Sequence, residues 1–203
     1  MEGEVADRRT ERTRTALMTA FIDLMLAQGY EAVSVEGVVD RANVGRSTFY
    51  LHYRSKEHIL RESLKRPSSV LAALVGGDVP TEAILFWMNH FHEQRRRNHM
   101  FFEGKARMIW VRCLADLIEP RLAALARHFR ARPSLPLTQI AQQIAETQLA
   151  LIAGWLTRKP SSKCEAVAEA LIDTTRATIA ALLKLKPDGV HLIPNESLRL
   201  REI

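Results

Sequence analysis

The chain has 203 residues, of which 47% are hydrophobic and 26% charged, and this composition excludes disordered and collagen-like classes in favour of a globular protein with a substantial core. Its formal charge of +6 and its pI near 9.7 suit a polyanionic partner. However, residues 1–66 contain eleven Lys and Arg against ten Asp and Glu, so net charge alone is a weak argument for DNA.

The first thirty residues predict a short mobile arm followed by one helix. The arm covers Met1 to about Asp7, and a basic cluster of Arg8, Arg9, Arg12 and Arg14 leads into the helix. The apolar face of this helix consists of Leu17, Phe21, Leu24 and Met25. Gly29 marks its end, because glycine is the preferred residue just past a helix C-terminus.

The stretch that begins at Ser34 predicts two short helices joined by a tight turn. The apolar stripe of the first helix consists of Val35, Val38, Val39 and Ala42, with Ser34 in place as its N-cap. Asn43 then interrupts the pattern, and asparagine tolerates the left-handed conformation that a tight turn requires. Gly45 follows two residues later. This arrangement is typical of a helix-turn-helix.

The second helix, from about Gly45 to Tyr53, is predicted to have an inner and an outer side. If Val44, Phe49 and Tyr53 anchor it to the first helix, the helical period turns another set of side chains outward. The residues on that outer side are Arg46, Ser47 and Tyr50. A helix of this kind fits the major groove of DNA.

The outward residues carry groups that suit DNA contacts. Arg46 can pair with a guanine edge or a phosphate, and Ser47 and Thr48 can donate to either. The hydroxyl of Tyr50 can reach the backbone. Lys56, in the first turn of a further helix that Ser55 is predicted to cap, is available to a phosphate.

Beyond residue 66 the sequence predicts a second, entirely helical region. Pro67 marks the exit from the first region, and a short helix over 70–74 stops at the glycines at 76 and 77. Further helical patterns cover about 80–97 and 100–129, with Pro120 starting a new turn of helix. Two long helices then cover 137–157 and about 164–186. Residues 187–203 form an extended tail for which we have no functional account.

The last two long helices predict a dimer interface. Both are apolar over a wide arc and carry small residues, so one side can pack on the domain while the other meets a partner. A four-helix interface in a homodimer is the natural outcome, and internal core on both sides is the alternative. No strand alternation, repeat or low-complexity segment occurs, and we therefore predict an all-α protein.

The sequence provides little support for an enzyme or a metal site. Four residues that could bind a metal are close in sequence: His90, His92, Glu93 and His99. However, His90 and His92 are rotated by about 200° from each other around a helix, and no H-E-x-x-H motif is present. No phosphate-binding loop or nucleophile elbow occurs. We expect neither a cofactor nor catalysis.

The two cysteines and the beginning of the chain bear on its compartment. Cys113 and Cys164 are isolated from each other and from any metal-ligand spacing, and we expect both to be buried, reduced thiols. Charged residues follow Met1, and no run of about eighteen apolar residues exists. We therefore expect a cytoplasmic protein with no membrane partner.

A ligand cavity is a more plausible second site. Aromatic, sulfur-containing and occasional polar side chains gather on the middle helices, which is the make-up of a mostly apolar cavity for a small apolar or aromatic molecule. This candidate set is Trp87, His90, Phe91, Phe102, Met108, Trp110, Cys113, Gln148 and Trp155. The same residues also describe an ordinary helical core.

The first region resembles the DNA-binding domain of the tetracycline-repressor (TetR) family of bacterial transcriptional regulators. Four pieces carry the resemblance in order across about fifty residues. They are G-Y-x-x-x-S-V at 29–35, A-N-V at 42–44, T-F-Y at 48–50 and H-Y-R-S-K-E at 52–57. Three residues depart from the usual pattern. Asn43 replaces a turn glycine, Gly45 stands where a capping serine is common, and Ser47 stands where glycine is frequent.

The resemblance implies roles for residues and regions. It implies that 1–66 is the helix-turn-helix DNA-binding domain and that 67–203 is a ligand-binding and dimerisation domain, with the dimer formed by the last two helices. It also implies that the arginines before the first helix approach the minor groove. The DNA-facing positions would be Ser34, Arg46, Ser47, Thr48, Tyr50, His52 and Lys56.

These observations favour a homodimeric regulator of transcription that binds operator DNA. We expect a repressor that a small molecule releases from the DNA. A helical protein–protein interaction module without ligand response is the alternative, and a small-molecule enzyme built on the apolar cavity is a third, weaker hypothesis.

Overall fold

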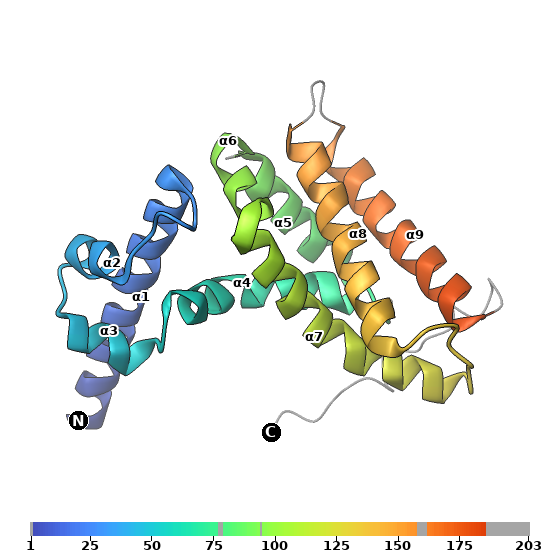
Figure 1. Cartoon of the computed structure of the whole chain (residues 1–203), viewed down its shortest axis with the longest axis horizontal. Coiled ribbons are helices and arrows are strands. Elements are labelled where there is room, and N and C mark those ends of the chain that lie inside the picture. The colour runs from blue at the N-terminus through green and yellow to red at the C-terminus, as the bar shows by residue number, and fades with distance from the viewer. Residues whose placement is uncertain (1, 77–78, 94, 158–161, 186–203) are drawn as a thin grey trace. The chain divides into compact units, whose positions relative to one another are not determined.

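The structure, a computed structural model, describes residues 2–76, 79–93, 95–157 and 162–185. Every regular element within these ranges is a helix, as the ribbon shows (Figure 1). This confirms the all-α prediction. The chain divides into two compact units: residues up to 65 together with 100–109, and residues 66–99 together with those from 110 onward.

The first helix, α1 (Glu2–Gln28), buries the predicted apolar face against the rest of the first unit. Leu17, Phe21 and Met25 are fully buried. Gly29, with a φ of +81°, ends the helix as expected. The prediction of a non-helical arm over residues 1–7 was wrong, because the helix already begins at Glu2. This segment has no proline, and Gly3 is the residue in it that disfavours a helix most, so little opposes the extension of the helix toward the N-terminus.

The helix-turn-helix forms as the sequence predicts. In α2 (Val35–Ala42) the Oγ of Ser34 accepts a hydrogen bond from the Gly37 amide at 3.0 Å, which confirms the N-cap. Asn43 adopts the left-handed conformation with a φ of +52°, and α3 (Arg46–His52) follows after Gly45. The reversal between the helices therefore depends on a residue that tolerates positive φ.

The fourth helix, α4 (Lys56–Ala73), runs through Pro67 without a break, so the predicted short helix over 70–74 is the end of this longer helix. Its N-terminus is capped by Ser55, whose Oγ accepts from the His58 amide at 3.1 Å. Proline removes one backbone donor, but here Pro67, Ser68 and Leu71 are buried. Tertiary packing on this side maintains the helix where local preference would end it.

A segment distant in sequence completes the first unit. Residues 100–109 include the end of a 3-10 turn, η1 (His99–Phe102), and the start of α7 (Gly104–His128). The carboxylate of Glu31 accepts from the Lys105 amide at 2.9 Å, and this bond lowers the pKa of Glu31. Glu31 thereby satisfies one of the unpaired donors at the N-terminus of α7.

The second unit begins with α5 (Thr81–Glu93) and α6 (Arg95–Asn98). Asn98 is buried, and its amide nitrogen donates to the carbonyls of His90 and Phe91 at 3.2 and 3.1 Å, which joins the short helix to α5. Helix α7 runs through Pro120 without interruption and ends at His128, within one residue of the predicted end of the helical pattern at 129.

Helices α8 (Leu137–Thr157) and α9 (Cys164–Leu183) lie side by side in the second unit (Figure 1). The bounds of α8 are as predicted. Helix α9 ends earlier than expected, because Lys184 takes the left-handed conformation with a φ of +54°. The predicted tail, 187–203, lies outside the described residues. Among the helices that the structure describes, none combines the length and the apolar character needed to cross a membrane.

Candidate nucleic-acid interface

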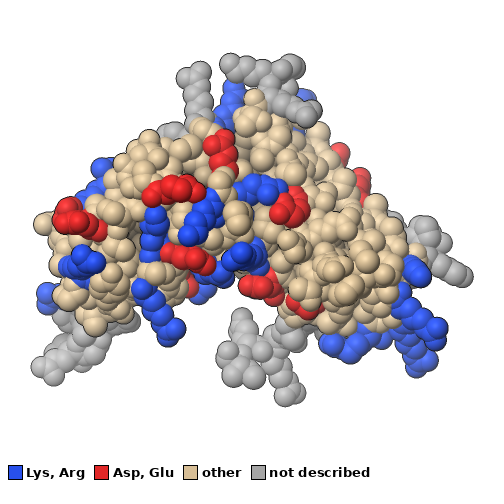
Figure 2. All heavy atoms as spheres, viewed as in Figure 1, with Lys and Arg blue, Asp and Glu red and all other residues tan. Residues whose placement is uncertain are grey.

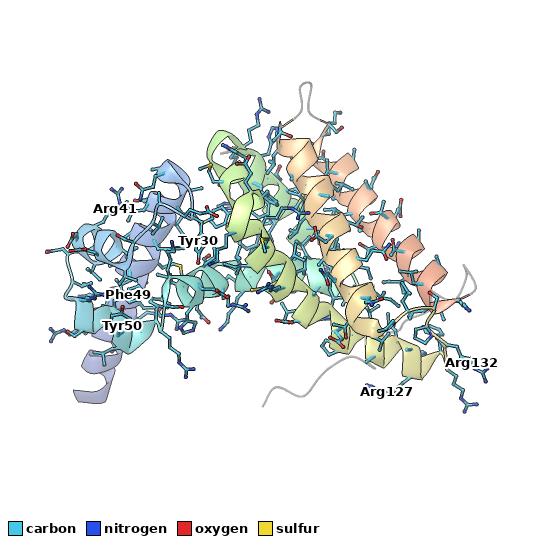
Figure 3. All side chains as sticks on the ribbon, viewed as in Figure 1. Tyr30, Arg41, Phe49, Tyr50, Arg127 and Arg132 are labelled. Atoms are coloured by element: carbon cyan, nitrogen blue, oxygen red, sulfur yellow. The ribbon has the colours of Figure 1, made fainter. Side chains whose placement is uncertain are left out.

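Helix α3 has a fully buried inner side and an exposed outer side. Phe49 and Tyr53 are 0% and 1% exposed, whereas Tyr50 is 49% exposed and Arg46 and Ser47 are exposed as well. The rings of Phe49 and Tyr50 meet edge to face with centroids 5.4 Å apart, and both are labelled on α3 in Figure 3. The buried Phe49 ring therefore restrains the orientation of the exposed Tyr50 ring.

The other predicted DNA-facing residues occupy different environments. Ser34 is exposed, and because its oxygen accepts the capping bond its hydroxyl can still donate outward. Thr48 and His52 are half-buried. The ring of His52 lies 6.3 Å from that of Tyr53. Both side chains are therefore only partly accessible.

Lys56 is less free than the sequence suggested. Its Nζ donates to the carbonyls of Tyr30 and Glu31 at 3.0 and 3.2 Å, and it lies 4.5 Å from the centroid of the Tyr30 ring. Burial lowers the pKa of Lys56, and the carboxylate of Glu31 partly offsets that effect. An ammonium has three donors, so one remains for a phosphate. Lys56 therefore also fixes the start of α4 against the turn after α1.

Ion pairs explain how a nearly neutral region can present a basic face. Asp23 pairs with Arg41 at 2.8 Å, and Glu57 pairs with Arg61 at 3.0 Å. Arg46, in contrast, makes no salt bridge with any described residue, and α3 contains no acidic residue. Asp23 and Glu57 thus neutralise arginines elsewhere in the unit, and neither lies on α3.

Glu62 gathers a larger group of cations in the same unit. Its carboxylate lies 2.9 Å from the Arg14 guanidinium and 2.6 Å from the Lys65 ammonium, with the His58 ring at 3.7 Å. Burial by itself would raise the pKa of Glu62, but these cations outweigh burial and the pKa lies below its usual value. The pair with Arg14 joins α4 to α1.

Two open hollows lie on the surface of the first unit, and the sequence did not indicate them. One, of about 520 Å³, is lined by Arg54, Ser55, Glu57, His58 and Arg61 at the start of α4. The other, of about 570 Å³, lies along α1 and is lined by Arg8, Glu11, Arg12, Thr15 and Ala16. Arginines spaced by one or two helical turns are the signal that could have revealed them.

A separate basic surface lies in the second unit. Figure 2 shows Lys and Arg gathered at the end of α7, where Figure 3 labels Arg127 and Arg132. Both side chains are exposed, as is Arg130. No Asp or Glu occurs between 120 and 145. Most of the excess positive charge of this chain therefore lies outside residues 1–66.

The structure brings together only part of the candidate ligand set. Ring centroids of Trp87 and His90 lie 5.4 Å apart, those of Trp87 and Phe91 5.7 Å, and those of Phe91 and Trp110 5.9 Å. Trp155 instead stacks on the His92 ring at 5.1 Å. Two further candidates, Phe102 and Met108, belong to the first unit, and Met108 is 56% exposed.

Several of these side chains satisfy their polar atoms within the protein. Trp110 is fully buried and donates to the Ser68 hydroxyl at 3.0 Å, and Trp155 donates to the Ser162 carbonyl at 2.8 Å. Cys113 and Cys164 are half-buried, which corrects the expectation that both are buried. Burial raises the pKa of the Cys164 thiol. The described residues contain no group of His, Cys, Asp and Glu that could hold a metal ion.

Gln148, a buried polar side chain of α8, keeps one polar atom without a hydrogen-bond partner among the described residues. It is 1% exposed, and its Nε2 donates to the Leu71 carbonyl at 3.3 Å and to the Thr175 hydroxyl at 3.0 Å. Its Oε1 has no hydrogen-bond partner among the described residues. An unpaired buried acceptor costs about 1–3 kcal/mol, so this oxygen is suited to a donor that the chain itself does not supply.

The three-helix unit with its exposed second helix of the turn is a helix-turn-helix DNA-binding domain. Residues 17–63 match the sequence profile described as "Bacterial regulatory proteins, tetR family". The transcriptional repressor KstR of Mycobacterium tuberculosis is 29% identical over 111 residues, which cover 52% of this chain and 50% of that protein. The chain spans about half the length, or less, of the curated relatives that it matches.

Solved structures extend the comparison beyond the first unit. A TetR transcriptional regulator from Streptococcus agalactiae is 26% identical with a TM-score of 0.56, covering 85% of this chain and 98% of that one. FadR from Thermus thermophilus, a TetR family repressor in complex with lauroyl-CoA, shares the fold at 17% identity and a TM-score of 0.51, covering 80% and 92%. Residues 17–63 thus carry the sequence pattern of TetR-family regulators, and the chain shares its fold with a TetR transcriptional regulator.

Proposed function

We propose that this regulator is a homodimeric repressor that binds operator DNA through α3 and is released from it by a small apolar or aromatic molecule. The observation that carries the proposal is the exposed outer side of α3, with Arg46, Ser47 and Tyr50 set against the buried Phe49 and Tyr53. A protein with this role acts on chromosomal DNA, so we expect it in the cytoplasm.

The proposed DNA contacts are of two kinds: some read base edges, and others position the protein on the phosphates. Arg46 is the candidate for a guanine edge, with Ser47 and Thr48 beside it. Tyr50 and the remaining donor of Lys56 would hold phosphates, and so would the hydroxyl of Ser34. His52 would contribute through the accessible part of its side chain. We assign these contacts to a DNA-binding domain over 1–66.

We assign ligand binding and dimerisation to the region 67–203. The dimer would form through the outward sides of α8 and α9, where small residues such as Ala150 and Ala177 are exposed. Nothing lies within 4 Å of the position that a Cβ on Gly154 would occupy, so a partner helix could approach α8 closely there. A twofold axis would present two copies of α3 to successive turns of the groove, roughly 34–36 Å apart.

The proposed ligand would contact the aromatic group of Trp87, His90, Phe91 and Trp110. Cys113 lies on α7 one turn from Trp110, and Trp155 lies on α8. Gln148 would supply the acceptor for a hydroxyl or amine of the ligand through its unpaired Oε1. Helices α4 and α7 each continue from one unit into the other. A ligand that favours one arrangement of these helices would lower operator affinity by its difference in binding free energy between the two states.

A gel-shift titration with the DNA that flanks the gene, at stated salt, tests DNA binding. The wild type should bind specifically, Tyr50→Ala and Lys56→Ala should weaken binding to all sequences, and Arg46→Ala should also relax base preference. Asn89→Ala, an exposed change on α5, is the matched control and should leave affinity unchanged. Absence of specific binding by the wild type would favour the interaction-module alternative.

Sedimentation tests the dimer separately. Gly154→Trp places a large ring in the open space on α8 and should yield monomers, whereas Asn89→Trp should not. Because each half-site is then bound independently, operator affinity of Gly154→Trp should fall with the loss of the dimer. A dimer that persists in this variant would exclude the α8–α9 interface.

A further inference from the structure

Leu51 has the most exposed large apolar side chain among the described residues, at 83%. It is the penultimate residue of α3 and lies two positions from Phe49 and two from Tyr53. The helical period of 3.6 residues therefore places it about 160° from each of these buried anchors. No other residue of α3 points more directly away from the core of the unit.

Position, rather than exposure alone, is the informative feature, since isolated exposed leucines are common on protein surfaces. Leu51 follows Ser47 by one helical turn and comes directly after Tyr50, and all three are exposed. The outermost line of α3 therefore carries one hydroxyl and one apolar side chain. A leucine here contributes little to folding of the first unit, because so little of its surface is covered.

The chemistry of leucine restricts what it can recognise on DNA. It has no hydrogen-bond donor or acceptor, so it can hold neither a phosphate nor the polar edge of a base. In the major groove the apolar group that distinguishes one base from the others is the C5-methyl of thymine. We propose that Leu51 is a specificity residue that reads a thymine methyl in each operator half-site. This inference rests on the proposed binding of DNA through α3.

A deoxyuridine scan of the operator tests the proposal directly. Deoxyuridine lacks only the C5-methyl and keeps every hydrogen-bonding group of thymidine, so any loss of affinity reports the methyl contact alone. Each thymidine of one half-site is replaced in turn, with the symmetry-related position replaced in the other half-site. Wild-type protein should lose roughly fourfold in affinity per methyl at one position, and roughly sixteenfold when both half-sites are changed.

The protein variants connect that loss to Leu51. Leu51→Ala should bind the thymidine operator more weakly by a similar factor and should be insensitive to deoxyuridine at the critical position. Ser47→Ala, on the same side of α3, should keep the sensitivity. Leu135→Ala is the matched control, because it truncates an exposed leucine in the second unit and should bind as the wild type does. 5-Bromodeoxyuridine, with a bromine close to a methyl in volume, should restore affinity.

The outcomes distinguish failure of the methyl contact from failure of DNA binding itself. Circular dichroism of Leu51→Ala should show a fold and melting temperature like those of the wild type, since the side chain is exposed. If the wild type binds the operator but deoxyuridine affects it and Leu51→Ala equally, or affects neither, Leu51 does not read a methyl and contacts at most the sugar. If the wild type binds no specific DNA at all, the proposed function and this inference are both wrong.

Discussion

The two units of this protein differ in how their buried and exposed residues are used. In the first unit a buried aromatic pair, Phe49 and Tyr53, supports an exposed reading surface within a single short helix. In the second unit Phe91, Trp110 and Trp155 are buried, and the two tryptophans satisfy their ring nitrogens internally. The DNA contacts proposed for the first unit therefore involve exposed side chains, whereas the ligand contact proposed for the second involves one unpaired buried oxygen, that of Gln148.

The distribution of fluorescent residues makes the comparison measurable. All three tryptophans, Trp87, Trp110 and Trp155, belong to the second unit, and all three tyrosines belong to the first. Tryptophan fluorescence therefore follows the second unit during unfolding, and circular dichroism follows the helices of both. A change confined to one unit should shift one signal more than the other.

The largest expected effect is that of Phe49→Ala. The ring is completely buried, so its removal should lower the free energy of unfolding of the first unit by about 3–5 kcal/mol. Tyr50→Ala, one residue further, should change stability by no more than about 0.5–1 kcal/mol while it weakens DNA binding. Urea unfolding followed by circular dichroism provides both values. Similar losses for the two variants would contradict the division of α3 into an inner and an outer side.

In the second unit we expect a smaller change in the free energy of unfolding, one that raises stability or leaves it unchanged. Gln148→Leu removes the unpaired Oε1, and the Leu71 carbonyl still accepts from the Leu74 amide at 3.3 Å. The Thr175 hydroxyl loses the Gln148 donor, but a helical threonine can donate to the carbonyl one turn earlier in its own helix. Unfolding followed by tryptophan fluorescence should therefore give an unchanged midpoint, or a free energy of unfolding that is higher by about 1 kcal/mol. A fall of about 2 kcal/mol or more would mean that the glutamine serves the fold and is not retained for a ligand.

The contribution of Glu62 to the free energy of unfolding should depend on pH. Its folded pKa is depressed, so the stabilisation is complete above the unfolded value of about 4.3 and disappears as the pH falls through the folded pKa. Because Arg14 and Lys65 are 49% and 67% exposed, the expected difference between wild type and Glu62→Gln is only about 0.5–1 kcal/mol at pH 7. Thermal melts by circular dichroism at several pH values should show this gap closing in acid, and a constant gap would contradict it.

The smallest effect concerns the cap of α3. Gly45 occupies the N-cap position without a side-chain hydrogen bond, and a Cβ there would meet its nearest neighbours at an ordinary 3.7 Å. Gly45→Ser should therefore stabilise the first unit by a few tenths of a kcal/mol. Melting of this variant by circular dichroism should show a slightly higher midpoint, and a lower one would mean that the serine hydroxyl does not reach the helix.

Much of the first unit could be predicted because its signals are local. The Ser34 cap, the left-handed Asn43 and the outward Tyr50 each follow from residues within one or two turns. Lys56 was predicted only in part. Its place at the start of α4 is local, but its bonds to the carbonyls of Tyr30 and Glu31 join positions about 25 residues apart. No periodic pattern carries that information.

The sequence alone determined that this chain is helical, that it has a helix-turn-helix near its N-terminus and which side of α3 faces outward. Caps, turn residues and apolar spacing suffice for these features because they act within a few residues. The tertiary structure decided that α4 and α7 continue through Pro67 and Pro120, that Phe102 and Met108 join the first unit, and that Gln148 keeps an unpaired oxygen. Those outcomes depend on packing between distant segments, and packing can override the local preference of any single residue.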